Sequence, residues 1–513
     1  MRITSSAITL CAIVLSVCFF AAPNLHAQMS FQKLPPTVNL PTESELAPVI
    51  SVDGKTLFFA RARVALDSSN VVDIWRSTLG ADGEFTKAEV VGGRLGSRYG
   101  IAVTSVSPDN NTLYLMGKFE EETPPDERIF VSHRTQNDWS IPEPIRIKNL
   151  NARGYYTDYS FGPNQKTLIM SIDRDSALGD RDLYVSFFDE SKNNWGTPLW
   201  LGAQINSRWG EMTPYLAADG KTLYFSSNRP GGLGEVDVYR TQRLDDSWQN
   251  WSAPENLGPT INRPGRTLYY SEDAKGEFAY FIWRANTTDQ SDIYKAKVPK
   301  PRANAVALLK GRVTDPSGKP LLARIRYERL SDGKELGAAR SDPKTGDYQI
   351  SLSGGEDYAV HAELENYVPT SERFDLRNLT EFKTIEHDLV LTKLETGAVV
   401  RLSNIFFETD KAVLLPESFS ELARLKELLD KNAALRISID GHTDSTGSVQ
   451  HNRTLSHDRA EAVRTYLTQQ GIDATRLELQ AFGPDHPVTS NATEEGRAKN
   501  RRVEFRVLGA AHQ

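Results

Sequence analysis

A unit of about 55 residues recurs along residues 31–298, and it restricts the fold more than any other feature of the chain. Each unit holds a polar turn and an apolar strand, followed by a second apolar strand with an aromatic residue. The threonines that open the first of these strands lie at positions 56, 112, 167 and 222. The aromatic residues of the second strand lie at 75, 130, 184, 239 and 294, so two independent markers keep one spacing. The chain therefore contains five copies of one supersecondary unit.

A third element ends four of the units and leaves the fifth incomplete. It is built on an aromatic residue, namely Phe85, Trp139, Trp195 or Trp251. The segment Phe31-Gln-Lys-Leu-Pro-Pro-Thr-Val-Asn-Leu reads like Trp251-Ser-Ala-Pro-Glu-Asn-Leu, so the N-terminal segment can supply the missing strand. Completing the last blade in this way removes free sheet edges. We expect residues 28–298 to form an all-β propeller of five blades, and the units resemble TolB-like (WD-like) propeller repeats.

Residues 299–394 are predicted to form a separate all-β module. Pro299-Lys-Pro301 marks a linker, and short alternating strands follow, such as Leu309-Lys-Gly-Arg-Val and Ala323-Arg-Ile-Arg-Tyr. Turns such as Asp342-Pro-Lys-Thr-Gly separate the strands, which is typical of a small antiparallel sandwich. We assign the sandwich to residues 305–394. It resembles the carboxypeptidase regulatory-like modules of secreted bacterial proteins, and this resemblance implies a spacer or a binding surface.

The segment Ile439–Ala460 carries the most informative chemical pattern in the chain. An apolar strand leads into a polar loop that contains Asp444, and an amphipathic helix follows. Asn452, Leu455 and Arg459 fall at i, i+3 and i+7 of that helix, on one face. A carboxylate set against a guanidinium suits a ligand that carries both an ammonium and a carboxylate. The same spacing also fits a structural ion pair between Asp444 and Arg459, or two solvated side chains.

Three motifs, in order, identify the C-terminal part of the chain by resemblance. They are Ile439-Asp-Gly-His-Thr-Asp, Asn452-x-x-Leu-Ser-x-x-Arg-Ala and Gly496-Arg-Ala-Lys-Asn-Arg-Arg-Val-Glu. Together they resemble the OmpA-like peptidoglycan-binding domain, over residues 395–511. Strands alternate with helices in this region, beginning with a predicted strand at 403–407, and this pattern favours an α/β sandwich with helices on one face.

The resemblance implies noncovalent binding of peptidoglycan at the diaminopimelate residue of its stem peptide. Carried over by position, Asp444 accepts the ammonium of that residue and Arg459 pairs with its carboxylate. The predicted binding residues are Asp410, Asp444, Asn452, Leu455, Arg459 and Arg502. Asp410 is alternatively a turn former, and Arg501 and Arg502 are alternatively charges at the end of a strand.

The N-terminal residues 1–27 are predicted to be a signal peptide. Arg2 precedes an apolar stretch at 8–20, and Leu25-His26-Ala27 is a suitable cleavage site. The alternatives are a retained N-terminal anchor and lipidation at Cys18. Cys11 and Cys18 are the two cysteines of the chain, so the processed protein contains no thiol and no disulfide. We therefore expect export to a periplasm, with association to the outer membrane and cell wall.

The function predicted from these features is a non-enzymatic envelope protein that binds peptidoglycan and presents its propeller to protein or envelope partners. The net charge of −7 gives no case for nucleic acid. No cofactor is expected, and the dispersed His442, His451 and His457 are weak evidence for a metal site. Gly-Lys-Thr at 54–56 and 220–222 lacks the upstream glycine of a phosphate loop. The alternative is a periplasmic hydrolase with a propeller active site, which needs carboxylates facing each other across a pocket.

Overall fold

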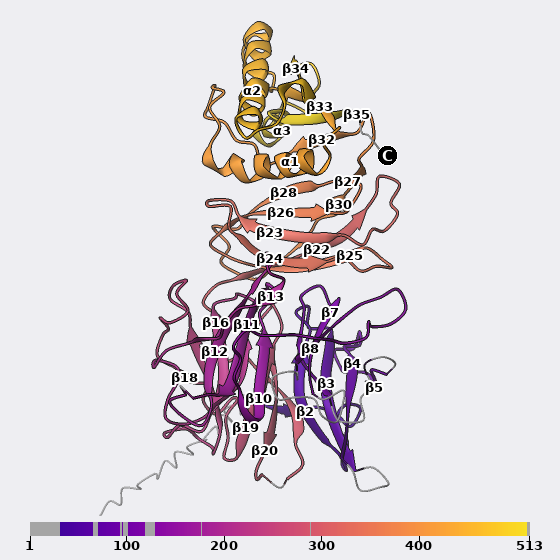
Figure 1. Ribbon diagram of the computed structural model, residues 1–513. Helices are drawn as coiled ribbons and strands as arrows, with labels where there is room; N and C mark the ends of the chain where they lie inside the picture. The colour runs from indigo at the N-terminus through magenta and orange to yellow at the C-terminus, as the bar shows by residue number, and fades with distance from the viewer. Residues whose placement is uncertain are drawn as a thin grey trace, which may run out of the picture.

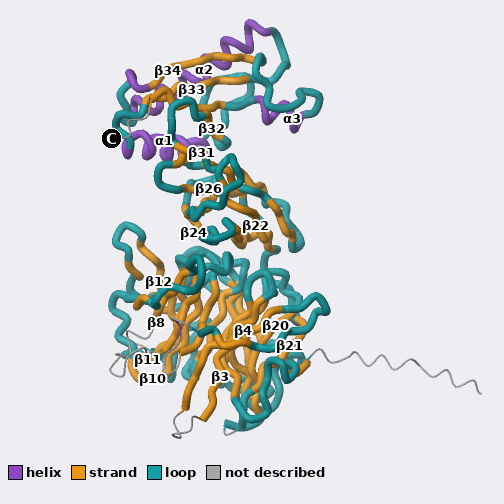
Figure 2. The backbone as a smooth tube through the Cα atoms, turned by 90° about the vertical axis from the view of Figure 1, so that its right-hand side faces the viewer, coloured by secondary structure: helices purple, strands orange, loops and turns teal. Residues whose placement is uncertain are grey.

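The computed structural model describes residues 31–64, 70–92, 95, 101–117, 129–175, 177–287 and 289–509. This part of the chain is mostly β and ends in an α/β domain. Figures 1 and 2 show three parts stacked end to end, with the repeats first, a smaller β part next and the α/β domain last. The predicted leader over residues 1–27, with Cys11 and Cys18, lies outside the described residues.

The repeats form five antiparallel sheets, one for each unit. The first strands are β2 (Ser44–Ile50), β6 (Ile101–Val106), β10 (Arg153–Phe161), β15 (Glu211–Leu216) and β19 (Arg266–Glu272). The second strands are β3 (Thr56–Val64), β7 (Thr112–Gly117), β11 (Thr167–Asp173), β16 (Thr222–Ser227) and β20 (Phe278–Arg284). The third strands are β4 (Asn70–Thr78), β8 (Ile129–His133), β12 (Asp182–Asp189), β17 (Asp237–Gln242) and β21 (Asp292–Lys297). The short outer strands are β5 (Glu89–Val90), β9 (Glu143–Pro144), β13 (Asn194–Trp195), β14 (Leu199–Trp200), β18 (Glu255–Asn256) and, for the last sheet, β1 (Gln32–Lys33).

The polar turns noted in the sequence join the first and second strands of each sheet. In the turn before β16, the Asp219 carboxylate accepts hydrogen bonds from the backbone N–H of Lys221 at 3.0 Å and of Thr222 at 2.8 Å. Gly220 follows Asp219 with a φ of 64°, a conformation that glycine adopts at no steric cost. These contacts confirm the predicted hairpin turn, because the side chain of Asp219 and the freedom of Gly220 together fix the reversal of the chain.

The first strands of consecutive sheets contact one another in sequence, from β2 to β6, β10, β15 and β19, and β19 contacts β2. Between the last and first sheets, the Ser271 hydroxyl accepts a hydrogen bond from the N–H of Ile50 at 3.4 Å and donates to the carbonyl of Pro48 at 3.1 Å. The N-terminal strand β1 pairs antiparallel with β21, as the incomplete fifth unit predicts. The first and last sheets are thereby joined to each other.

A buried asparagine secures the N-terminal segment to the last sheet. The Asn39 amide donates to the carbonyl of Ile293 at 3.0 Å and accepts from its N–H at 2.9 Å. Asn206 and Asn262 make the same pair of bonds to Leu183 and Val238, which occupy the equivalent positions of β12 and β17. Asn39 therefore does for the last sheet what the asparagines of complete units do within their own sheets.

The middle part is a sandwich of two sheets around an apolar core. One sheet contains β22 (Val306–Thr314), β25 (Asp347–Ser353), β29 (Lys383–Glu386) and β30 (Leu389–Val390). The other contains β23 (Arg324–Arg329), β24 (Glu335–Arg340), β26 (Asp357–Glu363) and β28 (Thr370–Asp375), and β27 (Tyr367–Val368) pairs with β31 (Thr392–Lys393). The expectation of an antiparallel sandwich is wrong for one sheet, because β22 pairs in parallel with β29 and β30. After β28, at the edge of the second sheet, the chain crosses back to the first sheet, where β29 runs in the same direction as β22.

The sandwich is docked on the turns of the second and third units. The Asn111 amide donates to the carbonyl of Arg340 at 3.0 Å, and the Gln165 amide donates to that of Ala338 at 2.9 Å. The buried Asp109 carboxylate accepts from the N–H of Arg340 at 2.8 Å. Residues of these turns thus provide hydrogen-bond partners for the backbone groups at the edge of β24. Asn111 and Gln165 replace the lysine and glycine of the Asp-Gly-Lys-Thr turns in the first and fourth units, so these departures from the repeat serve the contact with the sandwich.

The C-terminal domain has a four-stranded sheet in the order β32-β35-β33-β34. Its elements are β32 (Val399–Leu402), α1 (Phe419–Lys431), β33 (Arg436–His442), α2 (Val449–Gln469), β34 (Leu477–Gly483), α3 (Glu494–Asn500) and β35 (Val503–Gly509). Leu422, Leu425 and Leu429 of α1 are buried in its core, whereas Phe419 is 42% exposed. The predicted strand at 403–407 is wrong. The Ser418 hydroxyl bonds both the N–H and the carbonyl of Phe406, which holds this segment as a loop.

Candidate functional site

The loop between β33 and α2 is shaped by a close approach of helix and strand. A Cβ atom on Gly441 would lie 2.1 Å from the carbonyl oxygen of Ser456, so glycine lets α2 pack directly against β33. The Ser448 hydroxyl caps α2 by accepting a hydrogen bond from the N–H of His451 at 3.2 Å. The loop from Thr443 to Gly447 is held between these two fixed points.

Asp444 is a nearly buried carboxylate, 7% exposed, in the middle of this loop. One oxygen accepts from the N–H of Thr446 at 2.7 Å, and the other accepts from the Arg501 guanidinium at 2.7 Å. Burial acts to raise the pKa of Asp444, but the bonds from Arg501 and Thr446 outweigh it and hold the pKa below its usual value. Asp444 is therefore ionised at neutral pH.

Asn452 lies on the buried face of α2 and fixes the loop. Its amide donates to the carbonyl of Thr446 at 2.9 Å and to that of Asp444 at 3.3 Å. Leu455, the next predicted residue, is half-buried on the same helix. Asn452 thus orders the loop that carries Asp444.

Arg459 is 9% exposed, and its Nε donates to the carbonyl of Lys411 at 3.1 Å. The guanidinium lies over the ring of Phe407, 5.1 Å from its centroid. Burial, with nearby Arg501, lowers the pKa of Arg459, while Asp410 and Asp444 act in the opposite direction. The terminal nitrogens of Arg459 have no hydrogen-bond partner among the described residues.

Asp410 lies at the rim of the cluster. Its φ of 54° places it in the left-handed region, as in a turn, and its carboxylate accepts from Nε2 of His451 at 2.8 Å. Both of the roles weighed for Asp410, turn residue and member of the cluster, are compatible with this position.

Arg502 faces away from Asp444 and belongs to a second buried cluster. Its Nε donates to Glu504 at 2.6 Å, and His442 lies 3.5 Å from the other oxygen of that carboxylate. Burial opposes ionisation of Glu504, but His442 and Arg502 hold its pKa at about 2. The structure thus places Arg501, and not Arg502, beside Asp444.

Sequence reasoning weighed Arg501 as a strand-end charge and missed its contact with Asp444. Arg501 follows α3, which the sequence did not predict, and Glu494 at the start of α3 holds its other terminal nitrogen at 2.7 Å. The signal present in the sequence was the adjacent pair Arg501-Arg502 just before β35.

The three histidines weighed as metal ligands contact three different carboxylates. His442 pairs with Glu504, His451 with Asp410, and His457 with Asp458 at 3.4 Å. Over the described residues, no group of three or more histidine, cysteine or acidic side chains is arranged to hold a metal ion.

The centre of the repeats holds a small cavity of about 40 Å³, lined mainly by apolar and tyrosine side chains. Asp158 is the one carboxylate among the described lining residues, and Arg181 binds it at 3.1 Å. Burial raises the pKa of Asp158. A pair of facing carboxylates, which a glycosidase requires, is not found among these lining residues.

None of the helices among the described residues has the length and apolar character needed to span a membrane.

The fold and the cluster around Asp444 define a small α/β domain that offers an anionic and a cationic group at one loop. Residues 406–501 match the family model described as the OmpA family. The chain therefore carries a C-terminal OmpA family domain.

The relatives described below each match about a fifth of the chain. The probable lipoprotein YiaD of Escherichia coli K12 is 39% identical over 103 residues, which cover 20% of this chain and 47% of that protein. The peptidoglycan-associated lipoprotein of Pseudomonas aeruginosa is 35% identical over 113 residues, covering 22% of this chain and 66% of that protein. The chain thus spans less than two thirds of either relative. The solved structure of the cell wall anchor of the T6SS from P. aeruginosa is 31% identical and covers 22% of this chain and 80% of its own, with a TM-score of 0.20.

Proposed function

We propose that this chain is a non-enzymatic cell-envelope protein that binds peptidoglycan noncovalently through its C-terminal domain. The observation that carries the proposal is the OmpA family domain in which the ionised Asp444 lies in the loop before α2, while Arg459 on α2 uses only its Nε for a hydrogen bond within the described residues. The relative from P. aeruginosa is named for its association with peptidoglycan. An envelope location, near the outer membrane or in the periplasm, agrees with that name.

In this proposal the ligand is the diaminopimelate residue of the stem peptide, held at its two charged ends. Asp444 accepts the ammonium, because an ionised carboxylate offers about four acceptor positions and two are used by Thr446 and Arg501. Arg459 takes the carboxylate through its terminal nitrogens, since its one hydrogen bond uses Nε. The Arg459 guanidinium is partly desolvated, so a bound anion stabilises its charge in place of the lost water.

Co-sedimentation of the full chain with purified peptidoglycan tests this site. Asp444→Ala and Arg459→Ala should each remove the protein from the pellet, because loss of one partner of a desolvated charge pair costs ~2–5 kcal/mol. Arg459→Lys should restore little, since an ammonium cannot make the bidentate contact. Arg464→Ala, an exposed arginine on the same helix, is the matched control and should pellet like the parent.

Comparing peptidoglycan that contains diaminopimelate with peptidoglycan that contains lysine makes the test specific for the proposed ligand. Peptidoglycan with lysine in place of diaminopimelate lacks the carboxylate that Arg459 binds, so the parent protein should pellet with it poorly. Equal pelleting with both walls, or full pelleting of Asp444→Ala, would show that the zwitterion is not what this site recognises.

We further infer that residues 28–298 form a closed five-bladed propeller that presents a surface to protein or envelope partners, and that residues 305–394 form a carboxypeptidase regulatory-like spacer. The first strands of the sheets contact one another from β2 through β19 and back to β2, which supports a closed ring of blades. The hydrogen bonds of Ser271 and Asn39 support it as well. The contacts of β24 with the repeat turns support a spacer that fixes the propeller to the rest of the chain.

A further inference from the structure

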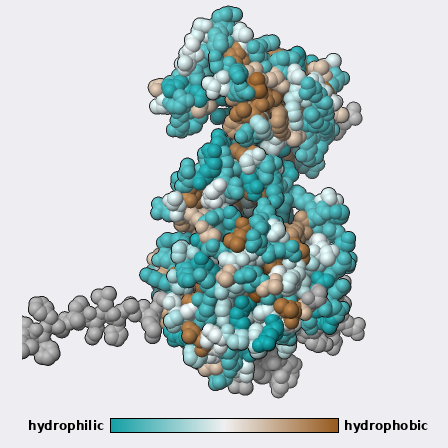
Figure 3. Space-filling view, turned by 90° about the vertical axis from the view of Figure 1, so that its left-hand side faces the viewer, coloured by the Kyte–Doolittle hydropathy of each residue, from teal (hydrophilic) through white to brown (hydrophobic). Residues whose placement is uncertain are grey.

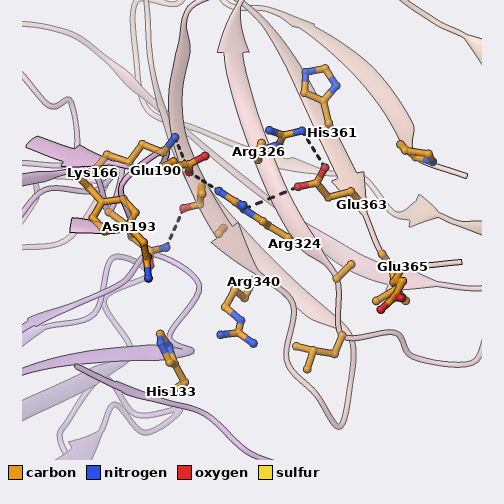
Figure 4. A pocket seen from close by; sticks show the side chains of 18 of the residues that line it. His133, Lys166, Glu190, Asn193, Arg324, Arg326, Arg340, His361, Glu363 and Glu365 are labelled. Atoms are coloured by element: carbon orange, nitrogen blue, oxygen red, sulfur yellow. Dashed lines mark hydrogen bonds and ion pairs between the residues drawn. The ribbon is translucent and has the colours of Figure 1, made fainter. Parts of the chain in front are cut away.

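A cavity of about 1500 Å³ lies where the second and third repeat units meet the sandwich and α1 (Figure 4). Pockets for small ligands typically measure roughly 300–1,000 Å³, so this cavity has room for a short oligomer. It is separate from the loop around Asp444, and none of the residues proposed to bind peptidoglycan lines it.

Most charged side chains of the cavity wall neutralise one another. Lys166 lies 2.9 Å from Glu190, and Arg326 lies 2.9 Å from Glu363. Arg340 differs from these residues because, like Arg146, it has no carboxylate of the described residues within ion-pair distance of its guanidinium. Its backbone is fixed by Asp109 and Asn111, so the free side chain projects from a rigid support.

His133 lies opposite Arg340 in the cavity (Figure 4). The Thr112 hydroxyl contacts its Nδ1 at 3.2 Å, and Nε2 has no partner among the described residues. Burial, together with the charge of Arg340, lowers the pKa of His133 to about 4. An anion placed between these groups would satisfy the guanidinium and accept a hydrogen bond from the imidazole.

The strand edges that line the cavity are closed to an added peptide strand. The edge of β24 is occupied by Asn164 and Gln165 at Ala338. The carbonyl of Trp195 in β13 accepts from the N–H of Lys148 at 3.0 Å, and β9 contains Pro144. Recognition by strand addition, which relies on free backbone groups, is therefore disfavoured here.

The remaining lining offers what sugar rings require. Asn193, Asn366 and Asn432 supply amides that both donate and accept, and Glu365, with no ion-pair partner among the described residues, supplies an acceptor. Tyr367 adds an aromatic ring that can lie against the C–H face of a sugar. We propose that the junction cavity binds a carboxylated oligosaccharide, with one carboxylate held between Arg340 and His133.

Calorimetric titration of the full chain with tetragalacturonate tests the proposal, and neutral maltotetraose is the charge control. Tetragalacturonate should bind, and maltotetraose should bind at least about tenfold more weakly, because it lacks the charge-assisted contact. Arg340→Gln should weaken tetragalacturonate binding by about tenfold or more for the same reason. This change keeps the backbone bonds to Asp109 and Asn111. Arg340→Lys keeps the charge without the planar fork, so its affinity for tetragalacturonate should lie between those of the parent and Arg340→Gln.

Arg436→Gln, an exposed arginine on β33 far from the cavity, should bind tetragalacturonate like the parent. Absence of tetragalacturonate binding, or unchanged binding by Arg340→Gln, would overturn the proposal. So would a tetraglutamate peptide that binds as tightly as tetragalacturonate, since the cavity would then recognise acidic peptides. Arg340→Gln leaves the site around Asp444 unchanged, so a loss of tetragalacturonate binding in this variant is independent of that site.

Discussion

The sheet of the C-terminal domain contains buried ionisable side chains, and their polar partners compensate for the loss of hydration. Asp440 is fully buried on β33, where it accepts from the Ser438 hydroxyl and lies 3.3 Å from Arg506. Glu504 on β35 is bound by Arg502 and His442. Burying a charge without such partners costs roughly several kcal/mol, so the sheet needs these contacts to hold ionised side chains. They also anchor the strands that flank the loop of Asp444.

Glu504→Gln should loosen β35 and change its response to acid. At pH 7 the loss of the charged acceptor should lower the local free energy of unfolding by about 2 kcal/mol. The pKa of Glu504 is about 2 in the folded protein, below the ordinary 4.5, so its contribution is complete above pH 4.5 and disappears as pH falls toward 2.

Hydrogen exchange of the β33 and β35 amides at several pH values measures this effect. The parent should lose protection between pH 4.5 and 2, and the variant should lose less over that range. Glu478→Gln, at an exposed pair with Arg436, is the control and should change protection little. An identical acid response in Glu504→Gln and the parent would contradict the assignment.

At the scale of elements, the N-terminal strand β1 is held by β21, at the other end of the repeats. Asn39→Leu should release β1, because the buried N–H of Ile293 loses the Asn39 oxygen and the carbonyl of Leu34 loses the Asn39 amide, at a cost of about 1–3 kcal/mol for each unpaired group. The N-terminal segment should then become accessible to protease near residues 31–40. Asn262→Leu breaks the same pair of bonds inside one unit and should destabilise its sheet without exposing that segment. Equal N-terminal cleavage in the two variants would argue against a special role for β1.

The second and third strands of each unit follow from the sequence, since the turn and the aromatic residue repeat at fixed spacing. The first strands were not predicted individually. Each contains a bulge, and Ala47, Thr213 and Tyr269 have positive φ values there, which interrupts the alternation of apolar and polar residues. The short polar α3 was missed for a related reason, because seven residues with little apolar character carry no helical periodicity. The contact between Arg501 and Asp444 was missed with it.

At the scale of the molecule, the sandwich and the C-terminal domain meet through a buried charge network. Arg424 of α1 lies 2.9 Å from Glu328 of β23 and 2.7 Å from Glu421. Burial opposes ionisation of Glu328, but His361 and Arg424 hold its pKa at about 2. The space-filling view shows a notch between the C-terminal domain and the rest of the molecule (Figure 3), so a narrow junction sets the orientation of the C-terminal domain.

Arg424→Met should free the C-terminal domain from the sandwich while each remains folded. The change leaves Glu328 and Glu421 buried without their shared cation, and breaking such a pair typically costs ~3–5 kcal/mol. Small-angle X-ray scattering of the full chain should then report a larger radius of gyration and a longer maximum dimension. Adding Glu328→Gln and Glu421→Gln to Arg424→Met removes the unpaired charges and should bring the scattering back toward the parent. Arg464→Met, at an exposed pair on α2, should leave the scattering unchanged. A scattering profile of Arg424→Met that superimposes on the parent would mean that the apolar contacts of the junction hold the two domains without the network.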